Sequence, residues 1–277
     1  MFNYKIKSYA KLNLGLKILN QRADNFHNIN SIFLTINLYD IIEFVPSKIF
    51  KIECSNKDIP IGTENTIYKA YQALNKEYLF KQHYKIILHK SIPVQSGLGG
   101  GSSNAAFTLI ALNNLFYLGL KCKELTDIAL KIGSDVPFFI EGGIKIIRGR
   151  GEIIEKYYAP IAHSLIFLLV FPDFNISTKW AYDKIKNTLD YNSDSIKFPP
   201  LVTNVDWELF ENDFEKIVGS AYPEMYEIKE CLKNNGALYS SLSGSGSTVF
   251  GVYNDGKFIK KAQNKLKNYN TLIVSPT

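Results

Sequence analysis

Four glycines within five residues, at positions 97, 99, 100 and 101, constrain this chain more than any other part of its sequence. Because glycine has no Cβ atom, such a segment adopts backbone conformations that other residues avoid and approaches a ligand closely. Polar residues follow, and the apolar spacing after them predicts a helix from about Ser102 to Phe116. The first N–H groups of a helix have no partner within it, and with the helix dipole they attract an anion. The sequence therefore predicts a phosphate-binding loop, with the hydroxyl of Ser102 or Ser103 as a further ligand of a phosphate or of Mg²⁺.

The glycine-rich segment differs from two common nucleotide-binding motifs. No Gly-Lys-Ser/Thr follows it, as a Walker A loop requires, and no strand runs directly into the turn, as in a Rossmann unit. On these residues alone, a flexible turn before a capped helix is an equally good interpretation.

Asp135 and Lys11 are candidates for catalysis of phosphoryl transfer to an alcohol. This reaction needs a base for the hydroxyl proton and a positive charge near the transferred group. A carboxylate such as Asp135 can be the base, and an ammonium such as Lys11 can keep it ionised. On residue type alone, however, a turn residue before Pro137 and a surface lysine are the more frequent interpretations.

The rest of the chain is a mixture of predicted strands and helices. Strands are predicted at Tyr4–Ala10, Leu12–Leu19, Ser31–Phe44, Phe50–Cys54, Tyr84–His89, Leu165–Phe171 and Thr248–Tyr253, and helices at Asn65–Leu74, Ser102–Phe116, Leu125–Ile132, Pro223–Lys233, Gly256–Lys267 and from Thr178. Both halves contain both kinds of element without strict β-α-β alternation, which favours an α+β fold with two lobes. A change of pattern near Pro160 predicts a boundary between a domain of residues 1–158 and a domain of residues 159–277.

Composition limits the class of protein and its partners. A hydrophobic fraction of 46% with 21% charged residues excludes a disordered chain, and the net charge of +6 suits a phosphorylated small molecule. The lysines are not gathered into a block, so we expect no nucleic-acid partner; no apolar run can span a bilayer, so we expect no membrane partner. Cys54, Cys122 and Cys231 show neither metal-ligand spacing nor a disulfide framework, which suits a cytoplasmic protein. We expect either a monomer or a homodimer, a choice that the sequence does not decide.

Four segments together resemble one known superfamily. Residues 93–106, from Pro93 to Ala106, resemble the phosphate-binding motif of the galactokinase, homoserine kinase, mevalonate kinase and phosphomevalonate kinase superfamily, the GHMP kinases. Residues 10–14 (Ala-Lys-Leu-Asn-Leu), 133–139 (Gly-Ser-Asp-Val-Pro-Phe-Phe) and 243–247 (Ser-Gly-Ser-Gly-Ser) resemble its other motifs in order and spacing. The resemblance implies an N-terminal ribosomal-protein-S5-like domain, a C-terminal ferredoxin-like domain, ATP as the phosphoryl donor and Mg²⁺, for which no carboxylate ligand is indicated.

The same resemblance implies roles for individual residues. Lys11 and Asp135 correspond to the catalytic pair. The ATP-binding residues would be Pro93, Gly97, Leu98, Gly99, Gly100, Gly101, Ser102 and Ser103, with Asn65 near the adenine, and the substrate would contact Asn13, Gly244 and Ser245.

Residues 22–28, Arg-Ala-Asp-Asn-Phe-His-Asn, are similar to the Arg-Ala-Asp-Gly-Tyr-His-Glu segment of the members that phosphorylate the 2-hydroxyl of a diphosphocytidyl alcohol. The similarity implies that Phe26 stacks on the cytosine and that His27 contacts its edge, although His27 is also compatible with a structural histidine in a polar turn. Residues 175–182 resemble a stretch with a substrate-binding threonine and a second aromatic ring, here Thr178 and Tyr182. Trp180 is the alternative ring, and both rings are equally compatible with core positions at the start of a helix.

Two other functions remain as alternatives. One is another GHMP enzyme, such as a homoserine kinase, a mevalonate kinase or a diphosphomevalonate decarboxylase, whose substrates carry no base for Phe26 to stack on. The other is a catalytically silent module that binds a nucleotide or RNA, which would not require Lys11 and Asp135 beside a phosphate loop.

Overall fold

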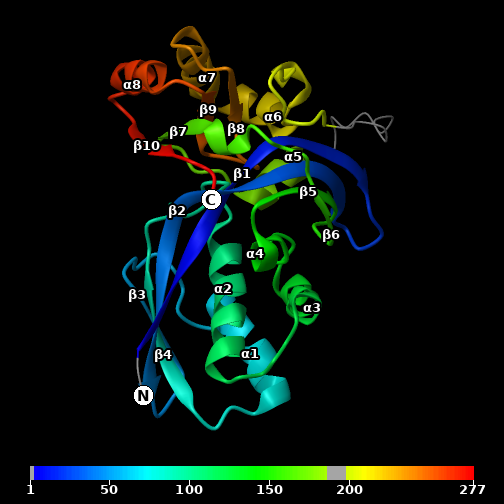
Figure 1. Ribbon diagram of the computed structural model, residues 1–277, viewed down its shortest axis with the longest axis vertical. Helices are drawn as coiled ribbons and strands as arrows, with labels where there is room; N and C mark the ends of the chain where they lie inside the picture. Colours follow the sequence, from blue (N-terminus) through cyan, green and yellow to red (C-terminus); the bar gives the residue numbers. More distant parts are fainter. Residues whose placement is uncertain (1–2, 186–197) are drawn as a thin grey trace. The chain divides into compact units, whose positions relative to one another are not determined.

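The computed structural model describes residues 3–185 and 198–277. These residues fall into two compact units whose segments alternate along the chain. The first unit contains the chain up to Ala10, Leu38–Val94 and Gly99–Gly142, and the second contains Lys11–Asn37, Gln95–Leu98 and the described residues from Gly143 on. Two long strands, β1 (Tyr4–Gln21) and β2 (His27–Ser47), contribute to both units (Figure 1). Because these units are not continuous pieces of chain, the division of the sequence after residue 158 stays a prediction.

The first unit combines a small sheet with a group of helices. In its sheet, residues 41–47 of β2 pair antiparallel with β4, and β3 pairs parallel with β4. The helix α2 packs against α1, α3 and α4. The bounds of these elements are β3 Lys51–Cys54, α1 Thr66–Tyr78, β4 His83–His89, α2 Gly100–Leu115, α3 Cys122–Ile132 and α4 Phe138–Glu141. The core contains the fully buried side chains of Phe44, Leu74, Ile86 and Leu109, so alternation in the strands and helical spacing in α1 and α2 both bury their apolar faces here.

The second unit contains a four-stranded antiparallel sheet in the order β10-β7-β9-β8. The helices α7 and α8 pack on this sheet, and α6 packs on β8 and against α5 (Figure 1). Residues 29–34 of β2 pair with β5, which pairs with β6. The bounds are β5 Ile144–Gly149, β6 Ile153–Lys156, β7 Ile166–Phe171, α5 Thr178–Ile185, α6 Phe214–Ala221, α7 Glu224–Asn234, β8 Tyr239–Leu242, β9 Val249–Tyr253, α8 Gly256–Lys265 and β10 Asn270–Val274, with short 3₁₀ turns at Ala162–Ser164 and Trp207–Leu209.

The predicted α+β class is confirmed, with two differences in detail. The predicted strands Tyr4–Ala10 and Leu12–Leu19 form the single strand β1, because Lys11 between them is buried and its N–H donates to the Leu98 carbonyl over 3.0 Å. The short helices α4 and α6 were not predicted. Among the described helices, none has the length and apolar character needed to cross a membrane.

Candidate active site

Lys11 and Asn13 form a buried polar centre on β1. They are two residues apart and therefore point to the same face of the strand, where Lys11 is 3% exposed. The Lys11 ammonium donates to the Asn13 Oδ1 atom and, over 3.0 Å, to the Gly97 carbonyl. The Asn13 Nδ2 atom donates to the Ser31 hydroxyl over 3.0 Å, and the ring of Phe33 lies 4.7 Å from the ammonium. Lys11 is thus a buried cation held between oxygen acceptors and an aromatic ring.

The turn of residues 243–247, hereafter the serine–glycine turn, packs against this centre. The Ser243 hydroxyl donates to the Gly97 carbonyl over 3.1 Å. A Cβ atom on Gly97 would lie 1.9 Å from the Ser243 carbonyl oxygen, and the φ of Gly97 is +76°, so only glycine fits this position. A Cβ atom on Gly244 would lie 3.2 Å from the Asn13 Oδ1 atom and 3.5 Å from the Lys11 ammonium. The structure thus brings together Lys11, Asn13, Gly97 and Gly244, all in the second unit.

The start of α2, in the first unit, has the features of an anion site. Gly99 precedes the helix with a φ of +70°, and no side chain caps the helix or places an acidic group in its first turn. The backbone N–H groups of the first turn therefore have no capping side chain, and no nearby acidic side chain offsets the positive end of the helix dipole. Thr66 donates to the Gly101 carbonyl over 2.7 Å, which holds the loop without using these N–H groups.

The two serines of this helix start have different environments. The Ser103 hydroxyl is fully buried, donates to the Tyr9 carbonyl over 2.6 Å and lies 2.7 Å from the Ser8 hydroxyl. It therefore anchors α2 to the first part of β1. Ser102 is partly exposed, and this difference favours Ser102 as the hydroxyl that meets a phosphate.

Asp40 fixes the chain on both sides of the glycine-rich loop. Its carboxylate accepts the Ser91 and Ile92 N–H groups over 2.8 and 2.9 Å, the Asn104 side-chain amide over 2.9 Å, and the buried Lys90 ammonium over 2.5 Å. The segment that precedes the loop and the helix that follows it are thus bonded to one buried carboxylate.

Asn65 and Asp135, which were predicted for ATP binding and catalysis, both belong to the first unit. Asn65 caps α1, since its Oδ1 atom accepts the Ile67 N–H over 2.8 Å and its Nδ2 atom donates to the Pro60 carbonyl. Its side chain is committed to its own loop, and a contact with adenine stays a prediction. Asp135 is partly exposed in the turn between α3 and α4 of the first unit, whereas Lys11 belongs to the second, so the catalytic pairing also stays a prediction.

The turn that connects β1 and β2 presents Phe26. Its ring is 48% exposed, and the Arg150 guanidinium lies 4.8 Å from the ring centre. The Arg22 N–H donates to the Phe26 carbonyl over 2.8 Å, which closes the turn, and Asn25 has a φ of +65°. This left-handed conformation explains why asparagine replaces the glycine of the related motif: after glycine, it is among the residues that adopt it most readily.

His27 and Tyr182 lie together in the second unit. The two rings stack with 5.4 Å between their centres and 25° between their planes, and His27 is buried. The Tyr182 ring also lies nearly perpendicular to that of Phe214, with 5.0 Å between the ring centres. Trp180 contacts Tyr222 instead, at 6.2 Å. This arrangement favours Tyr182 over Trp180 as the second aromatic ring of the predicted base-binding site.

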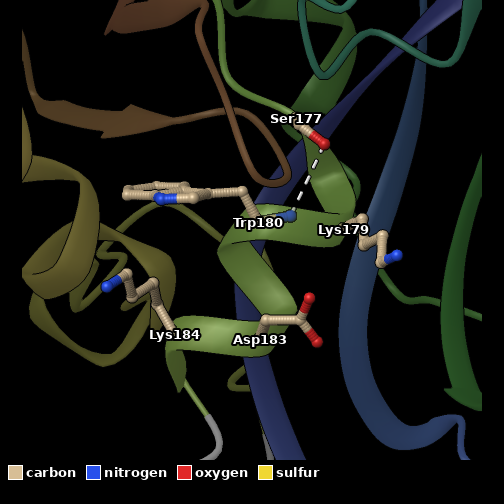
Figure 2. A pocket seen from close by; sticks show the side chains of 5 residues that line it. All are labelled: Ser177, Lys179, Trp180, Asp183 and Lys184. Atoms are coloured by element: carbon tan, nitrogen blue, oxygen red, sulfur yellow. Dashed lines mark hydrogen bonds between the residues drawn. The ribbon is translucent and has the colours of Figure 1, made fainter.

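The helix α5 also borders a surface pocket of about 440 Å³. Ser177, Lys179, Trp180, Asp183 and Lys184 line it, and the Trp180 N–H donates to the Ser177 hydroxyl over 3.5 Å (Figure 2). Figure 2 shows Lys179 and Asp183 on one side of the helix and Trp180 and Lys184 on the other. The predicted residue Thr178 is not among the lining residues, and its hydroxyl instead lies 3.2 Å from that of the predicted Ser245.

Three residues that contact the site were not predicted. Ser243 lies within a motif that had been noticed, and Arg150 lies in the sequence Gly-Arg-Gly, where the glycines signal a turn but not a contact with Phe26. Asn212, which bonds to the serine–glycine turn, carries no sequence signal, since the helix α6 that follows it was not predicted. Within 3–185 and 198–277, no group of three or more histidine, cysteine, aspartate or glutamate side chains could hold a metal ion.

Comparison with known proteins confirms the predicted resemblance. Residues 65–143 match the model of the GHMP kinases N terminal domain, and residues 204–271 match that of the GHMP kinases C terminal domain. The chain is 38% identical, over 284 aligned residues, to the 4-diphosphocytidyl-2-C-methyl-D-erythritol kinase of Thermoanaerobacter pseudethanolicus, with 100% of this chain and 97% of the relative covered.

Solved structures agree with this result. A crystal structure of 4-(cytidine 5'-diphospho)-2C-methyl-D-erythritol kinase superposes with a TM-score of 0.78 at 26% identity, over 99% of each chain. The homoserine kinase from Cytophaga hutchinsonii has the same TM-score at 17% identity, over 99% of this chain and 94% of its own, and thus shares the fold. Because the two structures have the same TM-score, the full-length sequence similarity, and not the fold, distinguishes the diphosphocytidyl-methylerythritol kinases from the homoserine kinases here. On this similarity, the chain belongs to the 4-diphosphocytidyl-2-C-methyl-D-erythritol kinase family of the GHMP kinases.

Proposed function

We propose that this small-molecule kinase transfers a phosphoryl group from ATP to the 2-hydroxyl of 4-diphosphocytidyl-2-C-methyl-D-erythritol, a step in the non-mevalonate synthesis of isoprenoid precursors. The observation that carries the choice of substrate is the half-exposed ring of Phe26, together with its sequence neighbour His27, whose ring stacks on Tyr182. A mevalonate or homoserine kinase has no base to bind and would not need these rings.

In the proposed mechanism, Asp135 accepts the proton of the substrate hydroxyl. The Lys11 ammonium stabilises the negative charge that develops on the oxygen, and its burial strengthens this interaction because the surroundings have a low dielectric constant. Asn13 holds Lys11 through its Oδ1 atom, and it orients the same hydroxyl. These roles follow from the resemblance of residues 10–14 and 133–139 to the family motifs.

ATP is proposed to bind with its phosphates at the start of α2. The uncapped N–H groups after Gly99 and the hydroxyl of Ser102 would meet the phosphate oxygens. Among the described residues, no group of three or more histidine, cysteine, aspartate or glutamate side chains could hold a metal ion, and Mg²⁺ in kinase sites is commonly bound through the substrate phosphates. Mg²⁺ would accompany ATP, bound to its phosphates.

The cytidyl group is proposed to lie against Phe26, His27 and Tyr182. Arg150 covers the Phe26 ring with a guanidinium and supplies positive charge near the diphosphate. Thr178, Gly244 and Ser245 would contact the rest of the substrate, and we expect the enzyme to act in the cytoplasm.

Isothermal titration with CDP and UDP tests this site directly. Wild-type protein should prefer CDP, and Phe26→Ala should weaken CDP binding by about 1–3 kcal/mol, the usual contribution of one stacked aromatic ring. Phe26→Tyr keeps the ring and should change little. A matched control is Phe258→Ala, since Phe258 is also a phenylalanine of the second unit and is 49% exposed. Equal affinity for CDP and UDP, or unchanged CDP affinity in Phe26→Ala, would contradict the proposed substrate.

A further inference from the structure

The segment Glu211–Asp213, which precedes α6, is fixed to β1 by its backbone. The Leu16 N–H donates to the Glu211 carbonyl over 2.8 Å, and the Asp213 N–H donates to the Leu16 carbonyl over 2.9 Å. The Asp213 carboxylate also accepts the Ile18 N–H over 2.7 Å. These bonds attach the segment to the strand that carries Lys11 and Asn13, within the second unit.

Between these two anchors, Asn212 turns its side chain to the serine–glycine turn. Its Nδ2 atom donates to the Leu242 carbonyl over 2.7 Å and to the Gly244 carbonyl over 2.8 Å. Its Oδ1 atom accepts the Phe214 N–H over 3.0 Å, and the residue is only 4% exposed. Both amide donors and the amide acceptor are therefore used, which determines the orientation of the side chain.

The Gly244 carbonyl connects this amide to the catalytic centre. Gly244 lies beside Asn13 and Lys11, because a Cβ atom added to it would lie 3.2 Å from the Asn13 Oδ1 atom and 3.5 Å from the Lys11 ammonium. Asn212 itself is hydrogen-bonded to neither residue. It is linked to the centre on two sides: its neighbours Glu211 and Asp213 bond to the backbone of β1, and its own amide bonds to the serine–glycine turn.

We propose that Asn212 is a positioning residue for phosphoryl transfer, whose amide sets the position of the serine–glycine turn against Lys11 and Asn13. This proposal rests on the proposed function, in which Lys11 stabilises the reacting oxygen. Two carbonyl oxygens that converge on one buried point require two donors from one small group, and the asparagine amide supplies them. An aspartate of the same shape would instead place a carboxylate against both carbonyls.

The first experiment compares Asn212→Ala with the matched control Asn235→Ala. The Asn235 amide also donates to a backbone carbonyl of the second unit, that of Cys231, over 2.8 Å, but it has no bond to the turn or to β1. We expect kcat with the diphosphocytidyl substrate to fall about 10- to 100-fold in Asn212→Ala, as a small misplacement of reacting groups does. The KM for ATP should stay within about twofold, and the control should keep kcat within about twofold. If Asn212→Ala does not fold, Asn212→Ser retains one donor and takes its place.

The second experiment distinguishes positioning from a general loss of stability. If Asn212 acts through Lys11, its substitution should have almost no further effect on kcat in a Lys11→Met background, so the two effects should not be additive. An equal fold loss in both backgrounds, or an unchanged kcat in Asn212→Ala, would overturn the proposal. A wild-type enzyme that does not phosphorylate the diphosphocytidyl substrate would instead contradict the proposed function itself.

Discussion

At the scale of single residues, the site depends on polar side chains whose partners lie far away in the sequence. Lys11 bonds to Gly97, and Asn13 bonds to Ser31 and to Ser243. These bonds stabilise the folded state, because a buried polar group without a hydrogen-bond partner destabilises it by about 1–3 kcal/mol. Although the family motifs are far apart in the sequence, several of their residues meet in the second unit.

Asp135→Asn tests the proposed base. Asparagine keeps the size and the hydrogen bonds of the side chain but cannot accept the hydroxyl proton, so kcat should fall about 10²- to 10⁴-fold. ATP affinity should change little, because Asp135 is assigned to the acceptor hydroxyl. Steady-state kinetics together with ATP titration measure both quantities. Near-normal turnover in a folded Asp135→Asn protein would remove Asp135 from the mechanism.

Sequence patterns identified residues of the site better than they assigned tasks to them. Residue type alone left Asp135 and Lys11 as ordinary turn and surface residues, and only the motif resemblance singled them out. Ser102 and Ser103 were equivalent in the sequence, but the structure buries Ser103 against Tyr9 because it lies on the inner face of α2. Such distinctions depend on tertiary contacts that no local pattern encodes.

At the scale of elements, the glycines of the phosphate loop differ in whether another residue could replace them. Gly97 has a positive φ and no room for a Cβ atom, whereas Gly101 is exposed in the first turn of α2 and its nearest neighbour would be the Thr66 hydroxyl at 3.8 Å. Gly97→Ala should therefore displace the serine–glycine turn and lower both stability and turnover.

Gly101→Ala is the matched variant and should have the opposite effect on stability. Alanine in a helix is favoured over glycine by about 0.5–1 kcal/mol, so the thermal midpoint should stay constant or rise. The KM for ATP should increase, because the new methyl group is added to the first turn of α2, where the phosphates are proposed to bind. Thermal denaturation and ATP titration of both variants check this pair. Unchanged ATP affinity in Gly101→Ala would place the phosphates elsewhere.

Long periodic elements were predictable and short or interrupted ones were not. The apolar spacing of α1 and α2 and the apolar run of β7 predicted these elements to within a few residues. The helix α6 has eight residues, with Phe214 and Val218 as its buried anchors, and this is too short for a clear helical period. The charged residue Lys11 interrupted the pattern of β1, although its burial beside Asn13 lets the strand continue.

At the scale of the whole molecule, the Lys17 ion pairs connect stability to pH. Burial by itself lowers the pKa of Lys17, but its bonds to Glu211 and Asp213 outweigh burial and raise the pKa above its ordinary value of 10.5. Because the pKa is higher in the folded state, the stabilisation is complete below pH 10.5 and is lost as the pH rises through the folded-state value.

As the pH rises above 10.5, the free energy of unfolding should therefore fall more steeply in the wild type than in Lys17→Met. Urea denaturation across this range measures the difference, and Lys51→Met is the control, since the Lys51 side chain is 56% exposed. Parallel curves for the wild type and Lys17→Met would show that these ion pairs do not contribute to the pH dependence.

The central claim is that this chain is a kinase for a diphosphocytidyl alcohol, and one measurement tests it most directly. Wild-type protein is supplied with ATP and Mg²⁺ and, in separate reactions, with 4-diphosphocytidyl-2-C-methyl-D-erythritol, mevalonate, homoserine or galactose, and ADP release is followed. The account predicts a kcat/KM for the diphosphocytidyl substrate at least about 100-fold above that for the others, because only this substrate uses the stacked base, and 100-fold corresponds to about 2.7 kcal/mol. Equal or greater activity with mevalonate, homoserine or galactose would contradict it.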